Sequence, residues 1–179
     1  MGFFQIQDRN SRFFAEFWDC YKSSFISDER RSFEKQLAIV RNPEYHLHAA
    51  TIDNNFIGFL SSWKFDDFVF LEHFAIVETE RGRGYGSDIL KEFISSSKVP
   101  IILEVEKPVS TDQKRRIAFY LGFGFHLNTF DYIQPSYGDG KNPLHLLLMS
   151  YPKELDDSSF NKIRDKLHTF VYGLKTSIK

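Results

Sequence analysis

The sequence Arg81-Gly82-Arg83-Gly84-Tyr85-Gly86-Ser87 lies between an apolar segment, residues 68–77, and a segment with helical spacing of apolar residues, 88–95. Glycine adopts positive φ without strain and lets the backbone approach a ligand closely. The start of a helix adds unpaired N–H groups and the positive end of the helix dipole. A strand, a glycine-rich turn and a helix in this order therefore predict a pyrophosphate-binding site; the alternative is a connector without a ligand.

Apolar periodicity predicts the elements on both sides of this turn. Upstream we expect a strand at 3–7, an aromatic-rich helix that includes residues 13–25, a helix that starts at Ser27 or Asp28 and stops before Pro43, and strands at 45–52, 56–63 and 68–77. Downstream we expect a strand at 101–106, a helix at 111–121, strands at 125–133 and 144–150, and a final helix. The strand, helix and strand around the turn imply a parallel pair with a right-handed crossover, so the sheet is mixed.

Two kinds of phosphate-binding motif fit the turn. Gly82-x-Gly84-x-x-Ser87, followed by Glu104, approximates the dinucleotide fingerprint. A doubly wound sheet, however, needs more strand and helix units than the sequence downstream provides. The other motif is Arg81-x-x-Gly84-x-Gly86, which corresponds to the Gln/Arg-x-x-Gly-x-Gly/Ala signature for the pyrophosphate of coenzyme A.

With this signature, the sequence resembles the GNAT superfamily of acetyl-CoA-dependent N-acyltransferases. Residues 70–76, the glycine-rich turn and the helix from Ser87 resemble the central motif of the family, and residues 102–106 and 118–125 resemble its next motif. The resemblance implies an α+β fold, with a mixed, mostly antiparallel sheet of six to seven strands, a splayed central parallel pair and helices on both faces. We expect a single domain over residues 1–179, with 156–175 as a C-terminal helical extension; the subfamily stays unassigned.

The resemblance also implies an activity and a cosubstrate. We expect an N-acetyltransferase that moves the acetyl group from acetyl-CoA to a primary amine of a small molecule or peptide, by direct attack in a ternary complex and without a metal. One alternative is a non-catalytic sensor module of the same fold that binds acyl-CoA. A remote alternative, from the dinucleotide motif, is a dinucleotide-dependent oxidoreductase.

By position in the family motif, the cofactor-binding residues divide into two groups. The end of a strand, Phe74, Ala75 and Ile76, pairs with the thioester-bearing arm, and a backbone amide near Ile76 polarises the thioester carbonyl. The turn holds the pyrophosphate through Arg81, Gly82, Arg83, Gly84, Tyr85, Gly86 and Ser87.

The catalytic candidates are one tyrosine and two carboxylates. Tyr120 matches the position where many members carry the general acid that protonates the departing thiolate. An amine that resembles lysine has a pKa of about 10.4, so its ammonium form needs a proton acceptor. Glu104 and Glu72 compete for this role, because a charge on a central strand is costly unless it is paired or lines a cleft. His73 or water are the remaining candidates.

Composition excludes several other classes. The 179 residues include 23 Lys and Arg against 24 Asp and Glu, so there is no basic surplus for nucleic acid. No apolar stretch reaches the roughly 20 residues of a membrane-spanning helix, and the N-terminal sequence lacks the pattern of a signal peptide, so we expect a cytoplasmic protein that contacts no membrane. His46 and His48 share a strand face without a third ligand, so we expect no metal. The expected state is a monomer or homodimer.

Overall fold

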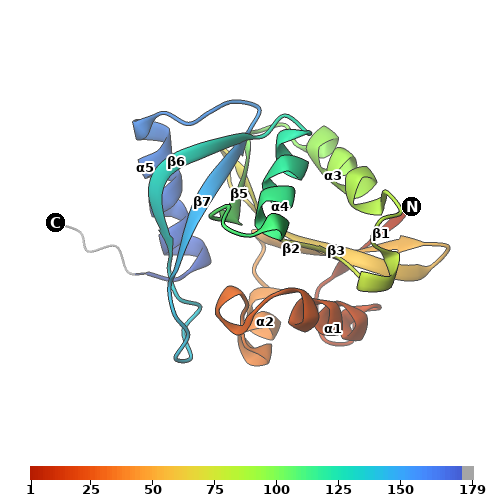
Figure 1. Ribbon diagram of the computed structural model, residues 1–179. Coiled ribbons are helices and arrows are strands. Elements are labelled where there is room, and N and C mark those ends of the chain that lie inside the picture. Colours follow the sequence, from red (N-terminus) through yellow and green to blue (C-terminus); the bar gives the residue numbers. More distant parts are fainter. Residues whose placement is uncertain (175–179) are drawn as a thin grey trace. The chain divides into compact units, whose positions relative to one another are not determined.

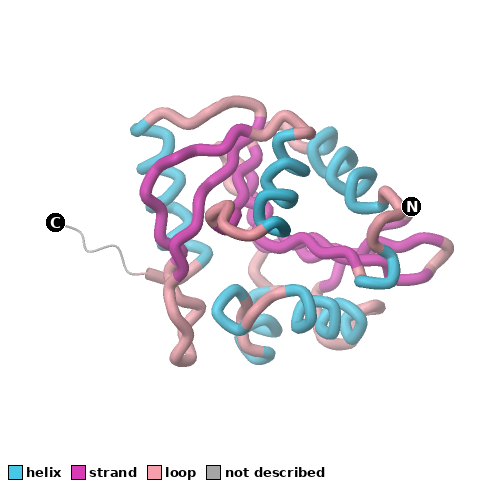
Figure 2. Tube along the Cα trace, in the orientation of Figure 1, coloured by secondary structure: helices cyan, strands magenta, loops and turns pink. Residues whose placement is uncertain are grey.

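A computed structural model describes residues 1–174 of the chain (Figure 1). Backbone contacts divide the chain into two compact units, one from Met1 to Ile101 and one from Ile102 onward. Each unit combines strands with helices, as the tube in Figure 2 shows. The chain is therefore of the α+β type in both parts.

The first unit contains four strands and three α-helices among its described residues. They are β1 (Gly2–Ile6), α1 (Phe14–Ser24), α2 (Phe33–Ile39), β2 (Tyr45–Ile52), β3 (Asn55–Lys64), β4 (Val69–Ile76) and α3 (Tyr85–Ser96). Neighbouring strands from β1 to β4 pair antiparallel, with Tyr45 opposite Trp63 in β2 and β3. Short turns join β2 to β3 and β3 to β4, and antiparallel pairing is what such turns allow.

Helices cover both faces of these strands, with α1 and α2 on one face of β2 and β3 and α3 on the opposite face (Figure 1). The aromatic stripe of α1 packs onto β3, where the rings of Phe17 and Phe59 meet edge to face with centroids 4.8 Å apart. Phe14, Phe17 and Tyr21 are buried, as their spacing of three and four residues predicts. The stripe is therefore part of the core.

Helix α3 connects β4 to the next strand, as the sequence predicts. The N–H of Val69, at the start of β4, donates a 2.9 Å hydrogen bond to the carbonyl of Pro100, just before the strand β5 (Ile101–Glu106). Glycine lets β3 lie close to the other end of β4, since a Cβ at Gly58 would stand 2.4 Å from the carbonyl oxygen of Ala75. Both ends of β4 are thus held by backbone contacts.

The second unit contains β5 (Ile101–Glu106), α4 (Thr111–Leu121), β6 (His126–Gln134), β7 (Leu144–Tyr151) and α5 (Asp157–Lys166). Strands β6 and β7 pair antiparallel. Helix α5 packs on β6 through stacked rings of Phe160 and Phe130, with centroids 4.3 Å apart. It continues into a π-helical turn, Leu167–Val171.

The observed bounds of β5 and α4 are those expected from the sequence, and two other helices differ. The helix expected to start at Ser27 or Asp28 starts later than predicted: Ser27–Glu29 is a 3-10 turn, and the separate helix α2 begins at Phe33 and ends before Pro43, as expected. Helix α3 starts at Tyr85, inside the glycine-rich motif, rather than at Asp88. The C-terminal helical extension is present from Asp157, but its expected end at residue 175 lies outside the described residues.

None of the helices within residues 1–174 combines the length and the apolar character that crossing a membrane requires.

Candidate functional site

The glycine-rich turn leads from β4 into α3 with two residues in the left-handed region. Gly82 has φ 78° and Gly84 has φ 86°. Gly84 is the N-cap of α3, and no side chain caps the helix. The first N–H groups of a helix lack acceptors within the helix, so this end presents backbone donors.

Among residues 1–174, the Cβ side of the two positive-φ glycines of this turn faces open space. A Cβ placed on Gly82 or Gly84 would meet nothing within 4 Å. A Cβ on Gly86 would make ordinary contacts with the Ile76 and Phe74 side chains, at 3.6 and 3.9 Å. The turn therefore lies against the end of β4 and leaves room for an anion at its two positive-φ glycines.

Two arginines flank the glycines. The Nε–H of Arg81 donates a 3.1 Å hydrogen bond to the carbonyl of Ile76, which ties the turn to the end of β4. Arg83 forms an exposed ion pair with Glu80 at 3.2 Å. Tyr85 and Ser87 lie in the first turn of α3 and are half-buried. The first unit thus brings together all the residues expected to bind the cofactor; their role stays a prediction.

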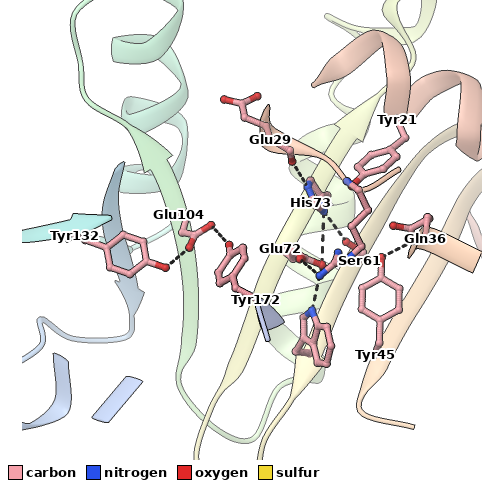
Figure 3. Close-up of polar contacts among 12 residues, drawn as sticks. Tyr21, Glu29, Gln36, Tyr45, Ser61, Glu72, His73, Glu104, Tyr132 and Tyr172 are labelled. Carbon is pink, nitrogen blue, oxygen red and sulfur yellow. Dashed lines mark hydrogen bonds and ion pairs between the residues drawn. The ribbon is translucent and has the colours of Figure 1, made fainter. Parts of the chain in front are cut away.

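Glu72, one of the two candidate bases, forms a buried ion pair. Its Oε1 is 2.7 Å from Arg31 Nη2, and the side chains are 0% and 5% exposed (Figure 3). Trp63 Nε1–H donates to its Oε2 at 3.1 Å, and the Arg31 guanidinium lies 5.8 Å from the Trp63 ring centroid. Arg31 was not predicted as part of this site, because nothing in its local sequence distinguishes it from a solvated arginine.

This environment determines the direction in which the pKa of Glu72 is shifted. Burial alone would raise the pKa of its carboxyl, but the charge of Arg31 and the contact with His73 outweigh burial and hold the pKa well below its ordinary value. A carboxylate with such a low pKa is a weak proton acceptor. The ion pair instead joins the segment before α2 to β4.

His73 is enclosed in the same region. Its Nε2–H donates to the carbonyl of Glu29 at 2.8 Å, and its Nδ1 lies 3.4 Å from Ser61 Oγ. Its ring lies between those of Tyr21 and Phe25, with both centroid distances 4.8 Å. These contacts assign His73 to the packing of β4 against α1 and the turn that follows it.

Glu104, the other candidate base, lies in the second unit and accepts two phenol hydrogen bonds. Tyr132 donates to its Oε1, and Tyr172 donates to its Oε2 at 2.7 Å (Figure 3). Burial and the neighbouring carboxylate raise the pKa of Tyr132 well above its ordinary value. Glu104 is thus hydrogen-bonded to a phenol at each of its two oxygens.

Tyr120, the candidate acid, is buried near the end of α4. Its ring packs edge to face on those of Phe119 and Phe125. Burial raises the pKa of its phenol to about 12, so the group stays protonated at neutral pH. Within residues 1–174, its hydroxyl makes no hydrogen bond to another protein group. The phenol thus keeps an unused donor.

Arg116 of α4 forms an ion pair with Glu106 in the same unit. Arg115 is exposed and lies 3.9 Å from Asp112. Among the described residues, there is no group of three or more His, Cys, Asp or Glu side chains that could hold a metal ion.

An α+β fold with a glycine-rich turn between a strand and an uncapped helix is typical of acyl-CoA-dependent acyltransferases. The chain matches the acetyltransferase (GNAT) family over residues 10–125, which is more than half of its length, and it belongs to this family. No curated protein matches the chain.

Solved structures give the same assignment. A protein from Bacteroides thetaiotaomicron assigned to the GNAT family of acetyltransferases is 36% identical, with a TM-score of 0.91 over 98% of this chain and 100% of that chain. The ribosomal-protein-S18-alanine N-acetyltransferase from Escherichia coli is 18% identical, with a TM-score of 0.60 over 87% and 96%. A GNAT acetyltransferase from Elizabethkingia anophelis with acetyl-CoA bound is 13% identical, with a TM-score of 0.56 over 83% and 95%.

The resemblance inferred from the sequence is thus confirmed, and so is the fold class. The chain has the α+β GNAT fold, with a mixed sheet of seven strands, one parallel pair and five α-helices in its described residues. Family membership favours the coenzyme A interpretation of the glycine-rich turn over the dinucleotide interpretation.

Proposed function

We propose that the protein is an N-acetyltransferase that transfers the acetyl group of acetyl-CoA to a primary amine of a small molecule or peptide, by direct attack in a ternary complex. Bound acetyl-CoA supplies a thioester whose carbonyl oxygen gains negative charge when the amine attacks. The proposal rests on one observation above all: the open, positive-φ turn at Gly82 and Gly84, joined to the uncapped start of α3. Such a turn is suited to a pyrophosphate.

The proposed cofactor site consists of this turn and the end of β4. Residues 81–87 bind the pyrophosphate through backbone N–H groups and the charges of Arg81 and Arg83. Phe74, Ala75 and Ile76 bind the thioester-bearing arm, and a backbone N–H near Ile76 stabilises the charge on the carbonyl oxygen. A fixed backbone donor does this without reorganisation, which is why it lowers the barrier.

Tyr120 is the proposed general acid. Its phenol is protonated at neutral pH, is buried, and keeps a donor that no described group uses. A thiolate leaving group is a strong base once water is excluded, so it takes a proton from a positioned phenol.

Glu104 is the proposed proton acceptor for the amine, directly or through water. The closed Glu72–Arg31 pair makes Glu72 a poor base and a structural residue. Tyr132 and Tyr172 hold the Glu104 carboxylate through hydrogen bonds, and a carboxylate within hydrogen-bond reach of an ammonium ion is a suitable proton acceptor.

The test is release of free coenzyme A thiol from acetyl-CoA in the presence of a panel of primary amines. We expect Tyr120→Phe to lower kcat while acetyl-CoA affinity stays nearly unchanged. Tyr151→Phe is the matched control, because it removes the hydroxyl of a half-buried tyrosine of β7 that packs on Phe125 and has no assigned role. Full turnover in Tyr120→Phe would remove Tyr120 from the mechanism. Binding of acetyl-CoA without turnover of any amine would favour the sensor alternative.

A further inference from the structure

The Glu104 carboxylate is held at both of its oxygens by hydroxyl groups of the same chain. Tyr132 of β6 donates to Oε1, and Tyr172, just after the π-helical turn, donates to Oε2 at 2.7 Å. We infer that Tyr132 and Tyr172 are positioning residues that fix the orientation of the Glu104 carboxylate for proton transfer. This inference rests on the role proposed above for Glu104.

Two hydrogen-bond donors restrict the rotation of the glutamate carboxylate. Rotation of the terminal carboxylate of glutamate is broad and roughly two-fold, so a single hydrogen bond leaves its plane loosely defined. A donor on each oxygen fixes the plane of the carboxylate. A proton acceptor must be held in hydrogen-bond reach of the proton that it takes, so this plane affects the rate.

Packing fixes both tyrosines in turn. Tyr132 is 1% exposed, and its ring lies 5.8 Å from that of His168. The ring of Tyr172 lies 5.2 Å from that of Tyr137. His168 is a further titratable group in contact with Tyr132; its Nε2–H donates to the carbonyl of Ile133, and burial lowers its pKa. The two phenols therefore form a rigid support.

Both tyrosines lie outside the residues that match the family. The match ends at residue 125, whereas Tyr132 and Tyr172 follow it in the chain. Tyr172 reaches Glu104 across 68 positions of sequence. The C-terminal segment thus contributes a side chain to the proposed proton acceptor, in addition to packing through Phe160.

The experiment compares Tyr132→Phe and Tyr172→Phe with Tyr151→Phe in the full chain. Each of the first two variants keeps its ring and loses one donor to Glu104. We expect kcat/KM to fall about 10-fold in each, with acetyl-CoA affinity unchanged. Because the phenols stabilise the charged carboxylate, we also expect the acidic limb of the kcat/KM profile to move up by roughly one pH unit. Tyr151→Phe keeps the profile of the unchanged protein.

A second measurement is independent of turnover. Carboxyl ¹³C NMR follows the titration of Glu104, whose signal is assigned by its loss in Glu104→Gln. We expect a higher Glu104 pKa in Tyr132→Phe and Tyr172→Phe. An unchanged Glu104 titration in both variants, or a raised pKa with unchanged kcat/KM, would overturn the inference. Full turnover in Glu104→Gln would instead overturn the proposed role of Glu104, and the positioning role with it.

Discussion

At the scale of single residues, the two glutamates differ in their partners more than in their position. Both lie on strands, Glu72 on β4 and Glu104 on β5. Glu72 faces a guanidinium in a closed pair, whereas Glu104 faces two phenols. A buried guanidinium partner strongly stabilises the charge of a carboxylate, so the role proposed for Glu72 is structural, whereas Glu104 is the proposed proton acceptor.

The first prediction concerns the Arg31–Glu72 pair. We expect Arg31→Met and Glu72→Gln each to lower the free energy of unfolding by about 3–5 kcal/mol, because each leaves a buried group without its partner. We expect the double variant to lose much less unfolding free energy than the sum of the losses in the two single variants. Asp19→Asn is the control, since it breaks an exposed ion pair with Lys22, of similar length at 2.9 Å, and costs less than about 1 kcal/mol. Chemical denaturation measures all four; additive effects of Arg31→Met and Glu72→Gln would contradict a coupled pair.

The same pair predicts a dependence on pH. The pKa of Glu72 in the folded chain lies below its unfolded value of 4.5, so below that pH the unfolded chain binds a proton that the folded chain does not. The stabilisation by Glu72 is therefore full above pH 4.5 and is lost as the pH falls toward the folded pKa. Denaturation curves between pH 6 and pH 3 should show that the free energy of unfolding falls less with decreasing pH in Glu72→Gln than in the unchanged protein. Equal slopes in the two proteins would argue against the depressed pKa.

A third prediction concerns the glycine-rich turn. Gly84 has φ 86°, so Gly84→Ala costs roughly 1–2 kcal/mol of folding free energy through backbone strain alone. It also weakens coenzyme A binding about 10-fold, because the proposed site needs close approach of the backbone. Gly86→Ala adds the same methyl group where it makes only ordinary contacts at 3.6 Å, and it retains affinity. Isothermal titration with coenzyme A compares them; equal affinities would place the pyrophosphate elsewhere.

At the scale of elements, α4 is anchored to the end of β5. Ser110 and Gln113 form a capping box, in which the Ser110 hydroxyl accepts from the N–H of Gln113. The Gln113 amide also donates to Glu106 at 3.3 Å, and Arg116 pairs with the same carboxylate. The helix that carries Tyr120 is thus fixed at its first turn.

The fourth prediction follows from this cap. Ser110→Ala removes the acceptor for the Gln113 N–H and should cost about 1 kcal/mol of folding free energy, whereas Ser110→Thr keeps most of it. Ser96→Ala is a matched change at the last turn of α3, where the hydroxyl only donates back to the carbonyl of Phe93, and it costs less than about 0.5 kcal/mol. Thermal and urea unfolding compare the three variants. A Ser110→Ala variant as stable as Ser96→Ala would contradict a capping role.

These elements also show what the sequence can predict. The bounds of α4 follow from its own residues, because its cap and its apolar spacing are local signals. The helix expected from Ser27 starts later for a long-range reason: Arg31 donates its N–H to the Tyr21 hydroxyl and sends its side chain to Glu72, so the chain at Arg30 is extended. Such a contact overrides local helix propensity.

At the scale of the whole molecule, the family and the fold were predictable from the sequence. The hydrogen bonds that hold the Glu104 side chain were not. The glycine-rich turn and its two flanking elements form one continuous stretch of sequence, so their pattern was sufficient to identify the family and to name candidate cofactor residues. Glu104 accepts hydrogen bonds from Tyr132 and Tyr172, which lie 28 and 68 positions away in the sequence. No periodicity or motif links residues at those distances, because only the folded chain brings them together.

The last prediction concerns the folded chain as a whole. A ligand that binds only the folded state stabilises it by about 2.7 kcal/mol at 100 times its Kd. For a chain of 179 residues, we therefore expect acetyl-CoA at that concentration to raise Tm by roughly 5–10 °C. NAD, the ligand of the dinucleotide alternative, should leave Tm unchanged.

Gly84→Ala separates specific binding from a general effect of the nucleotide in this measurement. At the same acetyl-CoA concentration its Tm rises less, because its affinity is lower, whereas Gly86→Ala responds like the unchanged protein. A chain that neither acetyl-CoA nor coenzyme A stabilises does not use this cosubstrate, and stabilisation by NAD alone would return the turn to the dinucleotide interpretation. An equal rise in both glycine variants would mean that acetyl-CoA binds without the positive-φ backbone of the turn.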